Sequence, residues 1–391
     1  MLVKATECTG CGGCAAACPK QCITMKIDAE GFRYPIINQE SCIQCKICEK
    51  TCSVLHVNEV SSCTEAFAVH NKDNEVRRES SSGGVFSELA KYVIEKRGYV
   101  CGAIYDENFE VRHTISNSID QLAFLRGAKY AQSIAEPCYK TIKNLLIKGN
   151  PVLFVGTPCQ VAGLQRYLKR DYSNLILVDM ICHGVPSPLI WKMYLKERRR
   201  KDAGGALINS VNLRSKISGW SKYSYSVVIR YENGVSYTEK QSNDIFMQGF
   251  VNNLYIRPSC EKCKFKGIER SSDFTLGDYW GIWDQYPEFD DNHGTSLVFI
   301  HSEKGYNLWK EIRDRFKYLR IDSEQAVAMN KSMLEGSVPH SRREEFFEYI
   351  SSCNDLCELI SRMLSSQHLE KGSILRKLLN RFIKCFIRLL K

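Results

Sequence analysis

The cysteines of this chain fall into runs whose spacing suits metal–sulfur chemistry. Residues 8–18 read CTGCGGCAAAC, a C-x2-C-x2-C-x3-C spacing, and residues 42–52, CIQCKICEKTC, repeat it 34 positions further along. Three cysteines at intervals of three residues can wrap one face of a cubane, and intervening glycines let backbone N–H groups turn toward the sulfurs. The spacing therefore predicts two [4Fe-4S] clusters. A pair of structural zinc sites is the alternative, but zinc does not need two interlocked runs.

The two runs resemble those of two-cluster bacterial ferredoxins, in which the fourth cysteine of each run binds the other cluster. We therefore expect a crossed arrangement of ligands. The first predicted ligand set is Cys8, Cys11, Cys14 and Cys52, and the second is Cys42, Cys45, Cys48 and Cys18. Cys22 lies outside the pattern and is predicted to be a small buried residue.

A third set of cysteines is scattered along the rest of the chain. Cys260 and Cys263 form a C-x-x-C pair, which supplies half of a four-coordinate site. Cys159 in VGTPCQ and Cys182 in MICHG each follow a predicted buried strand, and neighbouring strand ends of an α/β sheet lie close together. Four thiolates without a suitably spaced histidine suggest a third [4Fe-4S] cluster. From the residues alone, zinc or free buried cysteines remain alternatives.

Composition indicates what kind of protein carries these cysteines. Nineteen cysteines in 391 residues, with no apolar signal segment at the start, favour metal ligands in a reducing cytoplasm over a secreted disulfide scaffold. No run of about eighteen apolar residues predicts a membrane-spanning helix. The net charge of +10 falls to +3 without the seven lysines and arginines of residues 371–391 (10 − 7 = 3). A nucleic-acid partner is therefore not predicted.

The elements that must position the cysteines alternate between strands and helices, which predicts an α+β or α/β class. Strands are expected at residues 65–71, in two paired segments within 99–116, at 151–155, at 175–180 and near 296–300. Helices are expected after the Ser/Gly turn at 79–84, after 156 and after 302. A hairpin is predicted around Asn233-Gly234, and a strand–turn–strand with Gly31 at its turn between the first two cysteine runs.

Five segments, in order along the chain, resemble the family of coenzyme F420 hydrogenase/dehydrogenase beta subunits. They are SSGGVFSELAKYVIEKRG, RGAKYAQS, GTPCQVAGL, ICHG and CEKCKFKGIERSSDFTLGDYWG, and they cover roughly residues 65–300. The family uses a flavin and an iron–sulfur cluster to pass electrons between a hydride carrier and one-electron partners. The resemblance implies that Cys159, Cys182, Cys260 and Cys263 hold a cluster beside an FAD.

The same resemblance implies which residues lie against the flavin. They are Ser82, Gly83, Gly84, Lys129 and Tyr130. Ser-Gly-Gly before a helix offers free N–H groups and a positive helix end to a pyrophosphate, although most Gly-Gly pairs are only turns. No G-x-G-x-x-G follows a strand, so an NAD site of the Rossmann type is not predicted.

The sequence identifies no catalytic residue, and the proton donor is unknown. His183 is expected to be a structural histidine. Asp278 is expected either to contact the cofactor or to close a turn. Trp280 and Trp283 are expected to belong to the core rather than to a cofactor platform.

We therefore predict an iron–sulfur flavoprotein oxidoreductase. It would pass electrons between coenzyme F420, or another hydride donor, and one-electron acceptors through FAD and [4Fe-4S] clusters. The alternative is an electron-relay subunit without its own small-molecule substrate that serves a partner enzyme. The expected domains are a ferredoxin domain at 1–60, the two parts of the flavin domain at 61–148 and 149–320, the latter with the third cluster, and a helical tail at 321–391.

The last residues, 371–391, read KGSILRKLLNRFIKCFIRLLK and predict a basic amphipathic helix. Such a helix is typical of segments that lie on an anionic membrane surface. Docking on a partner protein and packing against its own body are the alternatives. We expect a peripheral contact at the inner face of the membrane.

Overall fold

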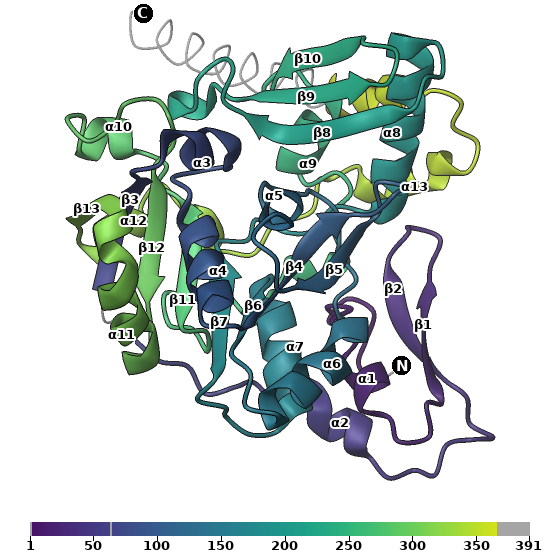
Figure 1. The fold of residues 1–391 in the computed structure, drawn as a ribbon. Coiled ribbons are helices and arrows are strands. Elements are labelled where there is room, and N and C mark those ends of the chain that lie inside the picture. The colour runs from purple at the N-terminus through teal and green to yellow at the C-terminus, as the bar shows by residue number, and fades with distance from the viewer. Residues whose placement is uncertain (1, 63–64, 366–391) are drawn as a thin grey trace, which may run out of the picture.

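The structure is a computed structural model that describes residues 2–62 and 65–365. Its N-terminal unit combines a hairpin with two short helices (Figure 1). These elements are α1 (Gly13–Ala17), β1 (Ile23–Ile27), β2 (Arg33–Ile37) and α2 (Ile47–Thr51). Gly31 lies in the hairpin turn, as predicted, with a φ of 87° that glycine adopts without strain. Each helix ends directly before the fourth cysteine of its run, Cys18 or Cys52.

An eight-stranded mixed sheet forms the centre of the body, with the strand order β13-β3-β12-β11-β7-β6-β4-β5. The strands are β3 (Glu65–Asn71), β4 (Tyr99–Tyr105), β5 (Val111–Ser116), β6 (Val152–Val155), β7 (Leu175–Met180), β11 (Phe274–Asp278), β12 (Ser296–Ile300) and β13 (Phe316–Arg320). The predicted antiparallel pairing of the segments within 99–116 is confirmed. Neighbours β4, β6, β7 and β11 are parallel, so their carboxyl ends meet at one edge, where ligand sites of α/β proteins form.

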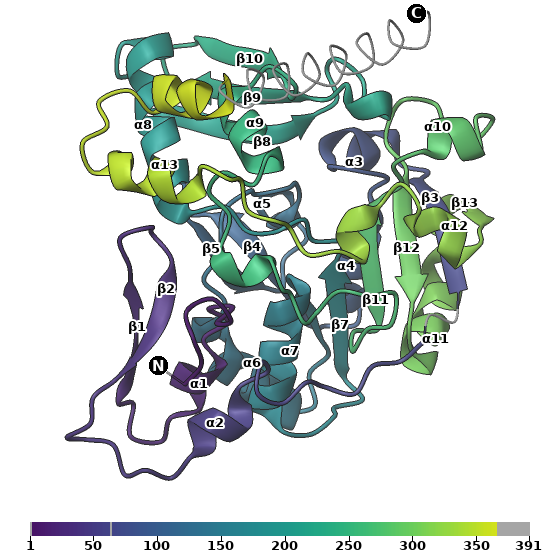
Figure 2. The same ribbon diagram turned by 180° about the vertical axis from the view of Figure 1, so that it is seen from behind.

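Helices cover both faces of this sheet (Figures 1 and 2). One face carries α4 (Val85–Glu95) and α11 (Glu303–Ile312), and the other carries α6 (Glu136–Ile147) and α7 (Pro158–Leu168). The shorter helices are α3 (Asn74–Glu79), α5 (Leu122–Leu125) and α10 (Ile282–Gln285). Leu153 and Phe154 of β6 belong to the two opposite cores because successive side chains of a strand point to opposite faces.

A three-stranded antiparallel sheet of order β10-β9-β8 forms a second layer, at the top of Figure 1. Its elements are α8 (Pro188–Ala203), β8 (Ile208–Ser215), β9 (Ser226–Tyr231), β10 (Ser236–Lys240) and α9 (Ile245–Val251). The predicted Asn233-Gly234 turn joins β9 to β10, and Gly234 has a φ of 84°. Aromatic side chains fill the core between this sheet and its helices, among them Trp191, Tyr194 and Phe246.

Beyond the central sheet, the described chain continues through short helical segments. They are α12 (Ser323–Val327), α13 (Arg343–Ile350) and residues 356–365. The predicted basic helix at 371–391 lies outside the described residues. Within the two described ranges, the helices are all too short or too polar to cross a bilayer.

Candidate cofactor and cluster site

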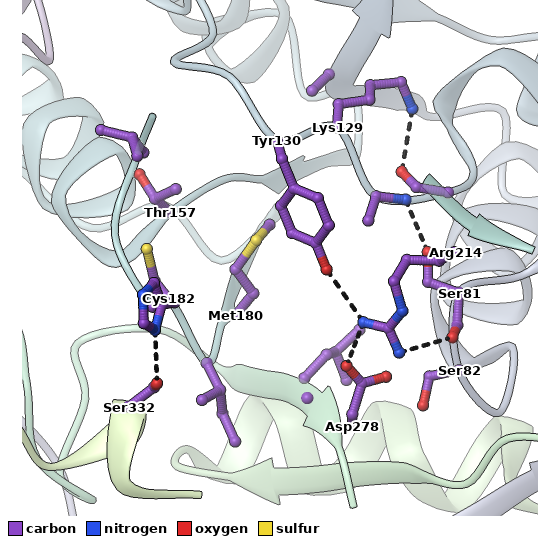
Figure 3. Close-up of a pocket in the computed structure, with 18 of the residues that line it drawn as sticks. Ser81, Ser82, Lys129, Tyr130, Thr157, Met180, Cys182, Arg214, Asp278 and Ser332 are labelled. Atoms are coloured by element: carbon purple, nitrogen blue, oxygen red, sulfur yellow. Dashed lines mark hydrogen bonds and ion pairs between the residues drawn. The ribbon is translucent and has the colours of Figure 1, made fainter. Parts of the chain in front are cut away.

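A cavity of about 740 Å³ lies at the carboxyl edge of the parallel strands, and residues of the three-stranded sheet also line it. Its lining includes Ser81, Ser82, Gly84, Lys129, Tyr130, Thr157, Cys159, Met180, Cys182, Arg214, Asp278 and Trp280. Figure 3 shows how several of these side chains converge from different strands and loops. A largely apolar cavity of this size, with a few converging polar groups, is typical of a site for a small molecule or cofactor.

Arg214, at the end of β8, organises the polar side of the cavity (Figure 3). Its Nη1 donates to Asp278 Oδ2 at 2.7 Å and to the Tyr130 hydroxyl at 3.1 Å. The guanidinium also lies over the rings of Tyr225 and Trp280. Its buried Nε has no hydrogen-bond partner among the described residues, so this N–H is available to a ligand. The sequence analysis missed Arg214, because no motif surrounds it.

Two residues whose roles the sequence left open or placed in the core face this cavity. Asp278 ends β11 and pairs with Arg214, so its carboxylate is part of the cavity wall. Trp280 also lines the cavity and stacks on Trp220 with ring centroids 4.7 Å apart. The predicted core role of Trp280 is therefore wrong in part. Trp283, in contrast, packs against a hydrophobic core cluster.

Lys129 contributes a cation to the cavity wall. Its Nζ donates to the carbonyls of Arg126 at 2.9 Å and Gly127 at 3.1 Å, and it forms no ion pair among the described residues. Burial lowers the pKa of Lys129 to about 7. An anion placed beside this ammonium group would favour its charged form.

The Ser/Gly turn before α4 is divided between the cavity and the core. Ser82 and Gly84 line the cavity, and Gly84 has the left-handed φ of 88°. The predicted role of Gly83 is not supported, because its N–H donates to Ser296 Oγ at 2.8 Å and is not free. A Cβ at Gly83 would lie 2.0 Å from the Val69 carbonyl oxygen, so this glycine serves the packing of the turn against the sheet.

Four cysteines from three segments gather beside the cavity. Cys159 lies in the first turn of α7, rather than at a strand end, and Cys182 follows β7, the neighbour of β6. Cys260 ends the 3₁₀ turn η2 (Pro258–Cys260), and Cys263 lies three residues beyond. Every pair among the four thiols interacts electrostatically. Burial, with the neighbouring thiols contributing, raises the pKa of Cys182 and that of Cys260 to about 12.

Backbone pairing brings these segments together. The N–H of Arg257 donates to the Val185 carbonyl at 2.9 Å, and the N–H of Ser187 donates to the Tyr255 carbonyl at 3.0 Å. The loop after β7 is therefore held against the segment that leads to Cys260.

His183 lines the cavity but has partners at both ring nitrogens, Asn253 Oδ1 at 2.6 Å and Ser332 Oγ at 3.3 Å, the latter drawn in Figure 3. Burial lowers the pKa of His183. Both observations agree with the structural role expected for this histidine.

The N-terminal cysteines gather in two crossed sets. In the first set, Cys14 interacts electrostatically with Cys8, Cys11 and Cys52. The second set lines a cavity of about 260 Å³ and consists of Cys18, Cys42, Cys45 and Cys48. Cys22 is buried, as predicted, but it also lines this second cavity, with its Sγ 3.3 Å from that of Cys18.

The first N-terminal set lies next to the cysteine set of the body. Tyr139 of α6 donates its hydroxyl to the Cys11 carbonyl at 3.1 Å and to the Gln160 carbonyl at 3.3 Å. The thiol of Cys11 also contributes to the raised pKa of Cys159. Helix α7 thus connects the two sets, with Cys159 at its start and Cys11 packed against its side.

The cysteine sets and their setting define an iron–sulfur electron-transfer protein. Residues 7–55 match the family described as 4Fe-4S dicluster domain. Residues 149–325 match the family described as the C terminus of the coenzyme F420 hydrogenase/dehydrogenase beta subunit, and this part of the chain belongs to that family. The predicted resemblance is confirmed.

A curated relative is a subunit of the F(420)H(2) dehydrogenase of Methanosarcina mazei, which is 28% identical over 198 residues. The match covers 46% of this chain and 54% of that protein, so the chain spans about half the length of this relative. A solved chain from the F420-reducing [NiFe] hydrogenase complex of Methanosarcina barkeri superposes with a TM-score of 0.50 at 15% identity. It covers 75% of this chain and 95% of its own length, and it supports the predicted mixed α/β fold.

Proposed function

We propose that this chain is an iron–sulfur flavoprotein oxidoreductase. It passes electrons between a hydride carrier of the coenzyme F420 kind and one-electron acceptors. FAD occupies the central cavity, Cys159, Cys182, Cys260 and Cys263 hold one [4Fe-4S] cluster, and the two N-terminal sets hold two more. The relatives whose names mention F420 support the choice of hydride carrier.

One observation carries the proposal, and it is the place of Cys159. This residue lines the cavity, belongs to the cysteine set of the body and interacts electrostatically with Cys11 of the ferredoxin unit. The cavity, the third cysteine set and the first ferredoxin set are therefore consecutive neighbours. That order is the one required to connect a hydride-accepting group to one-electron carriers.

The residues present fit a flavin dinucleotide. The cavity wall holds Lys129, which has no carboxylate partner in the described part of the chain, and Arg214, whose Nε is unpaired there. Both groups suit the negative charge of a pyrophosphate or of a reduced flavin. When bound, a flavin supplies the exchange between a hydride and single electrons. The apolar lining and the ring of Trp280 exclude water from the site.

The cysteine set of the body fits a cluster better than a single ion. Zinc holds sulfurs about 2.3 Å from the metal, which places them about 3.8 Å from one another. Among the described residues, no three of these sulfurs lie within 4.8 Å of each other. The same holds for the cysteines of the dicluster domain, so this wide spacing is shared with the iron–sulfur sets of the chain.

The composition of the purified protein tests this assignment. Anaerobically purified protein should contain about twelve iron atoms, four for each of three clusters, and about one flavin per chain. A content of about eight iron atoms without flavin would contradict the proposal.

The hydride carrier is tested separately. Reduced coenzyme F420, NADH and NADPH are mixed in turn with the oxidised protein, and bleaching of the flavin and cluster absorption is followed. Rapid bleaching by reduced F420 supports the proposed activity. Bleaching only by a reduced partner protein would instead identify a relay subunit without its own substrate.

A further inference from the structure

A buried guanidinium lies at the junction of the ferredoxin unit and the body. Arg257 is 1% exposed and directly precedes the 3₁₀ turn that ends at Cys260. Its carbonyl accepts the N–H of Cys260 at 3.0 Å. The backbone of Arg257 therefore belongs to the segment that places a cysteine of the body set.

The side chain of Arg257 reaches into the ferredoxin unit. Its Nε donates to the Cys8 carbonyl at 2.7 Å, its Nη2 to the Arg33 carbonyl at 3.0 Å, and its Nη1 to Gln132 Oε1 at 2.7 Å. The guanidinium carbon lies 4.3 Å from the centre of the Tyr34 ring. All these acceptors and rings are uncharged.

The loop of the first cysteine run makes room for this group. A Cβ at Gly10 would lie 2.8 Å from Arg257 Nη1, and Gly10 has a φ of 68° that a side chain rarely adopts. Gly10 stands between Cys8 and Cys11, so the guanidinium is packed against the loop that carries two cysteines of the first set.

Arg257 is exceptional among the buried arginines of the described residues. There are five, and four of them pair with carboxylates: Arg77 with Asp291, Arg214 with Asp278, Arg270 with Asp179, and Arg343 with Glu30. Arg257 has no carboxylate partner in the described ranges. A nearby carboxylate is also taken, because Glu136 pairs with Arg33 at 2.7 Å.

A buried charge without a counter-charge is strongly unfavourable, because it loses its hydration without compensation. Four thiolates around an iron–sulfur core leave a net negative charge. Arg257 donates to Cys8, a residue of one such set, and its charge lowers the pKa of Cys260, a residue of another. The two cysteine sets are therefore the anionic groups that this cation faces.

We propose that Arg257 is the shared counter-charge of the first ferredoxin cluster and the cluster of the body, and that it tunes the reduction potentials of both. The cluster of the body belongs to the proposed function, whereas the first ferredoxin cluster belongs to the dicluster domain. A fixed cation favours the more negative, reduced state of each cluster. Because guanidinium stays protonated at every accessible pH, this bias is constant.

Two variants test the charge of Arg257 in the full-length protein. Arg257→Gln removes the charge, and Gln132→Glu keeps Arg257 but places a carboxylate against its Nη1. Anaerobic redox titration monitored by electron paramagnetic resonance measures each cluster. In both variants we expect the ratio of reduced to oxidised cluster, at a fixed potential, to fall about tenfold for these two clusters, which is about 59 mV for one electron. The cluster of Cys18, Cys42, Cys45 and Cys48 should not change.

Arg343→Gln is the matched control, because Arg343 also joins the ferredoxin hairpin to the body but is neutralised by Glu30. It should leave all potentials unchanged. An equal fall in the control would assign the effect to loosening of the interface and overturn the proposal, as would unchanged potentials in Gln132→Glu. If Arg257→Gln does not fold, Gln132→Glu alone decides. If the body holds no cluster, the proposed function fails, but a shift of the first ferredoxin cluster still supports the role of Arg257.

Discussion

Gly163 of α7 and Cys11 of the ferredoxin unit pack against each other with no room for a side chain between them. A Cβ at Gly163 would lie 2.9 Å from both Cβ and Sγ of Cys11. The glycine is in the middle of a helix, where it is intrinsically unfavourable by about 1 kcal/mol relative to alanine. Its presence there is explained by the close approach of the cysteine loop.

Gly163→Ala should therefore displace the Cys11 loop. Overpacking a tight contact costs about 1–3 kcal/mol, which offsets or exceeds the helical gain of about 1 kcal/mol. We expect no stabilisation in chemical denaturation and a changed paramagnetic signal of the first ferredoxin cluster. The control is Ala162→Gly, which weakens the same helix without a new contact. It should be less stable and keep the signal unchanged, and a stabilised Gly163→Ala with a native signal would refute the close contact.

Cys182→Ser should remove one cluster and leave two. We expect a loss of about four iron atoms per chain, because a cluster of this type seldom survives without one of its thiolates. The ferredoxin signals should persist, since their cysteines belong to the other sets. Iron analysis and spectroscopy of anaerobic protein measure both effects.

Cys22→Ala is the comparison for that experiment. Its thiol lies 3.3 Å from Cys18, but it is outside the spacing of the two runs. We expect full iron content. A loss of about four iron atoms in Cys22→Ala would show that Cys22 is a ligand, and an unchanged content in Cys182→Ser would remove this residue from the third set.

Arg214→Met should destabilise the protein and reduce its flavin content. The substitution leaves Asp278 without its ion-pair partner at a site where only 4% of the Arg214 side chain and 17% of that of Asp278 are exposed. Breaking a buried pair from one side costs about 3–5 kcal/mol. Chemical denaturation of the flavin-free protein measures the first effect, and flavin analysis measures the second.

Lys192→Met provides the matched surface control. Lys192 pairs with Glu110 at 3.3 Å, with side chains 67% and 48% exposed. An exposed pair of this kind contributes about 0–1 kcal/mol. A similar loss of stability in both variants would contradict a buried role for the pair of Arg214 and Asp278.

Lys129 should make the stability of the flavin-free protein depend on pH. Burial lowers the pKa of Lys129 to about 7, while the unfolded chain keeps an ordinary value near 10.4. Between these values the unfolded state binds more protons, so this residue makes stability rise with pH. The burial penalty is complete below pH 7 and disappears toward pH 10.5.

Lys129→Met removes this contribution. We expect the variant to be more stable than the wild type at pH 7, with a difference that shrinks as the pH approaches 10. Lys216, another buried lysine with a pKa lowered to about 7, remains in both proteins, so the comparison cancels its effect. A difference in unfolding free energy that is constant from pH 7 to pH 10 would rule out the lowered pKa of Lys129.

The ferredoxin unit was predictable because its chemistry is encoded over short distances in the chain. Cysteines at intervals of three residues specify the curvature of the loop around a cluster, and helices α1 and α2 end directly before Cys18 and Cys52. The strand-and-helix alternation of the body was equally readable. Its hydrophobic runs determine which segments become the buried strands β6 and β7, and therefore which residues lie just beyond their carboxyl ends.

The contents of the cavity depended on how the strands are arranged in space. Cys159 and Cys263 are 104 residues apart (263 − 159 = 104), and they meet because parallel β6 and β7 are neighbours and the loop after β7 pairs with residues 255–257. Arg214 comes from the other sheet and reaches Asp278 without any local signal.

The same reason explains the one flavin-contact prediction that was not supported, and the residue that was missed. Gly83 looked like a free N–H donor, but Ser296, 213 residues away, takes its hydrogen bond. Arg257 looked like an ordinary charged residue until the fold placed it between two cysteine sets without a carboxylate. Covalent spacing determines which ligands share a loop. Which charges and hydrogen bonds remain available at a site depends on long-range packing, because partners distant in the chain consume them.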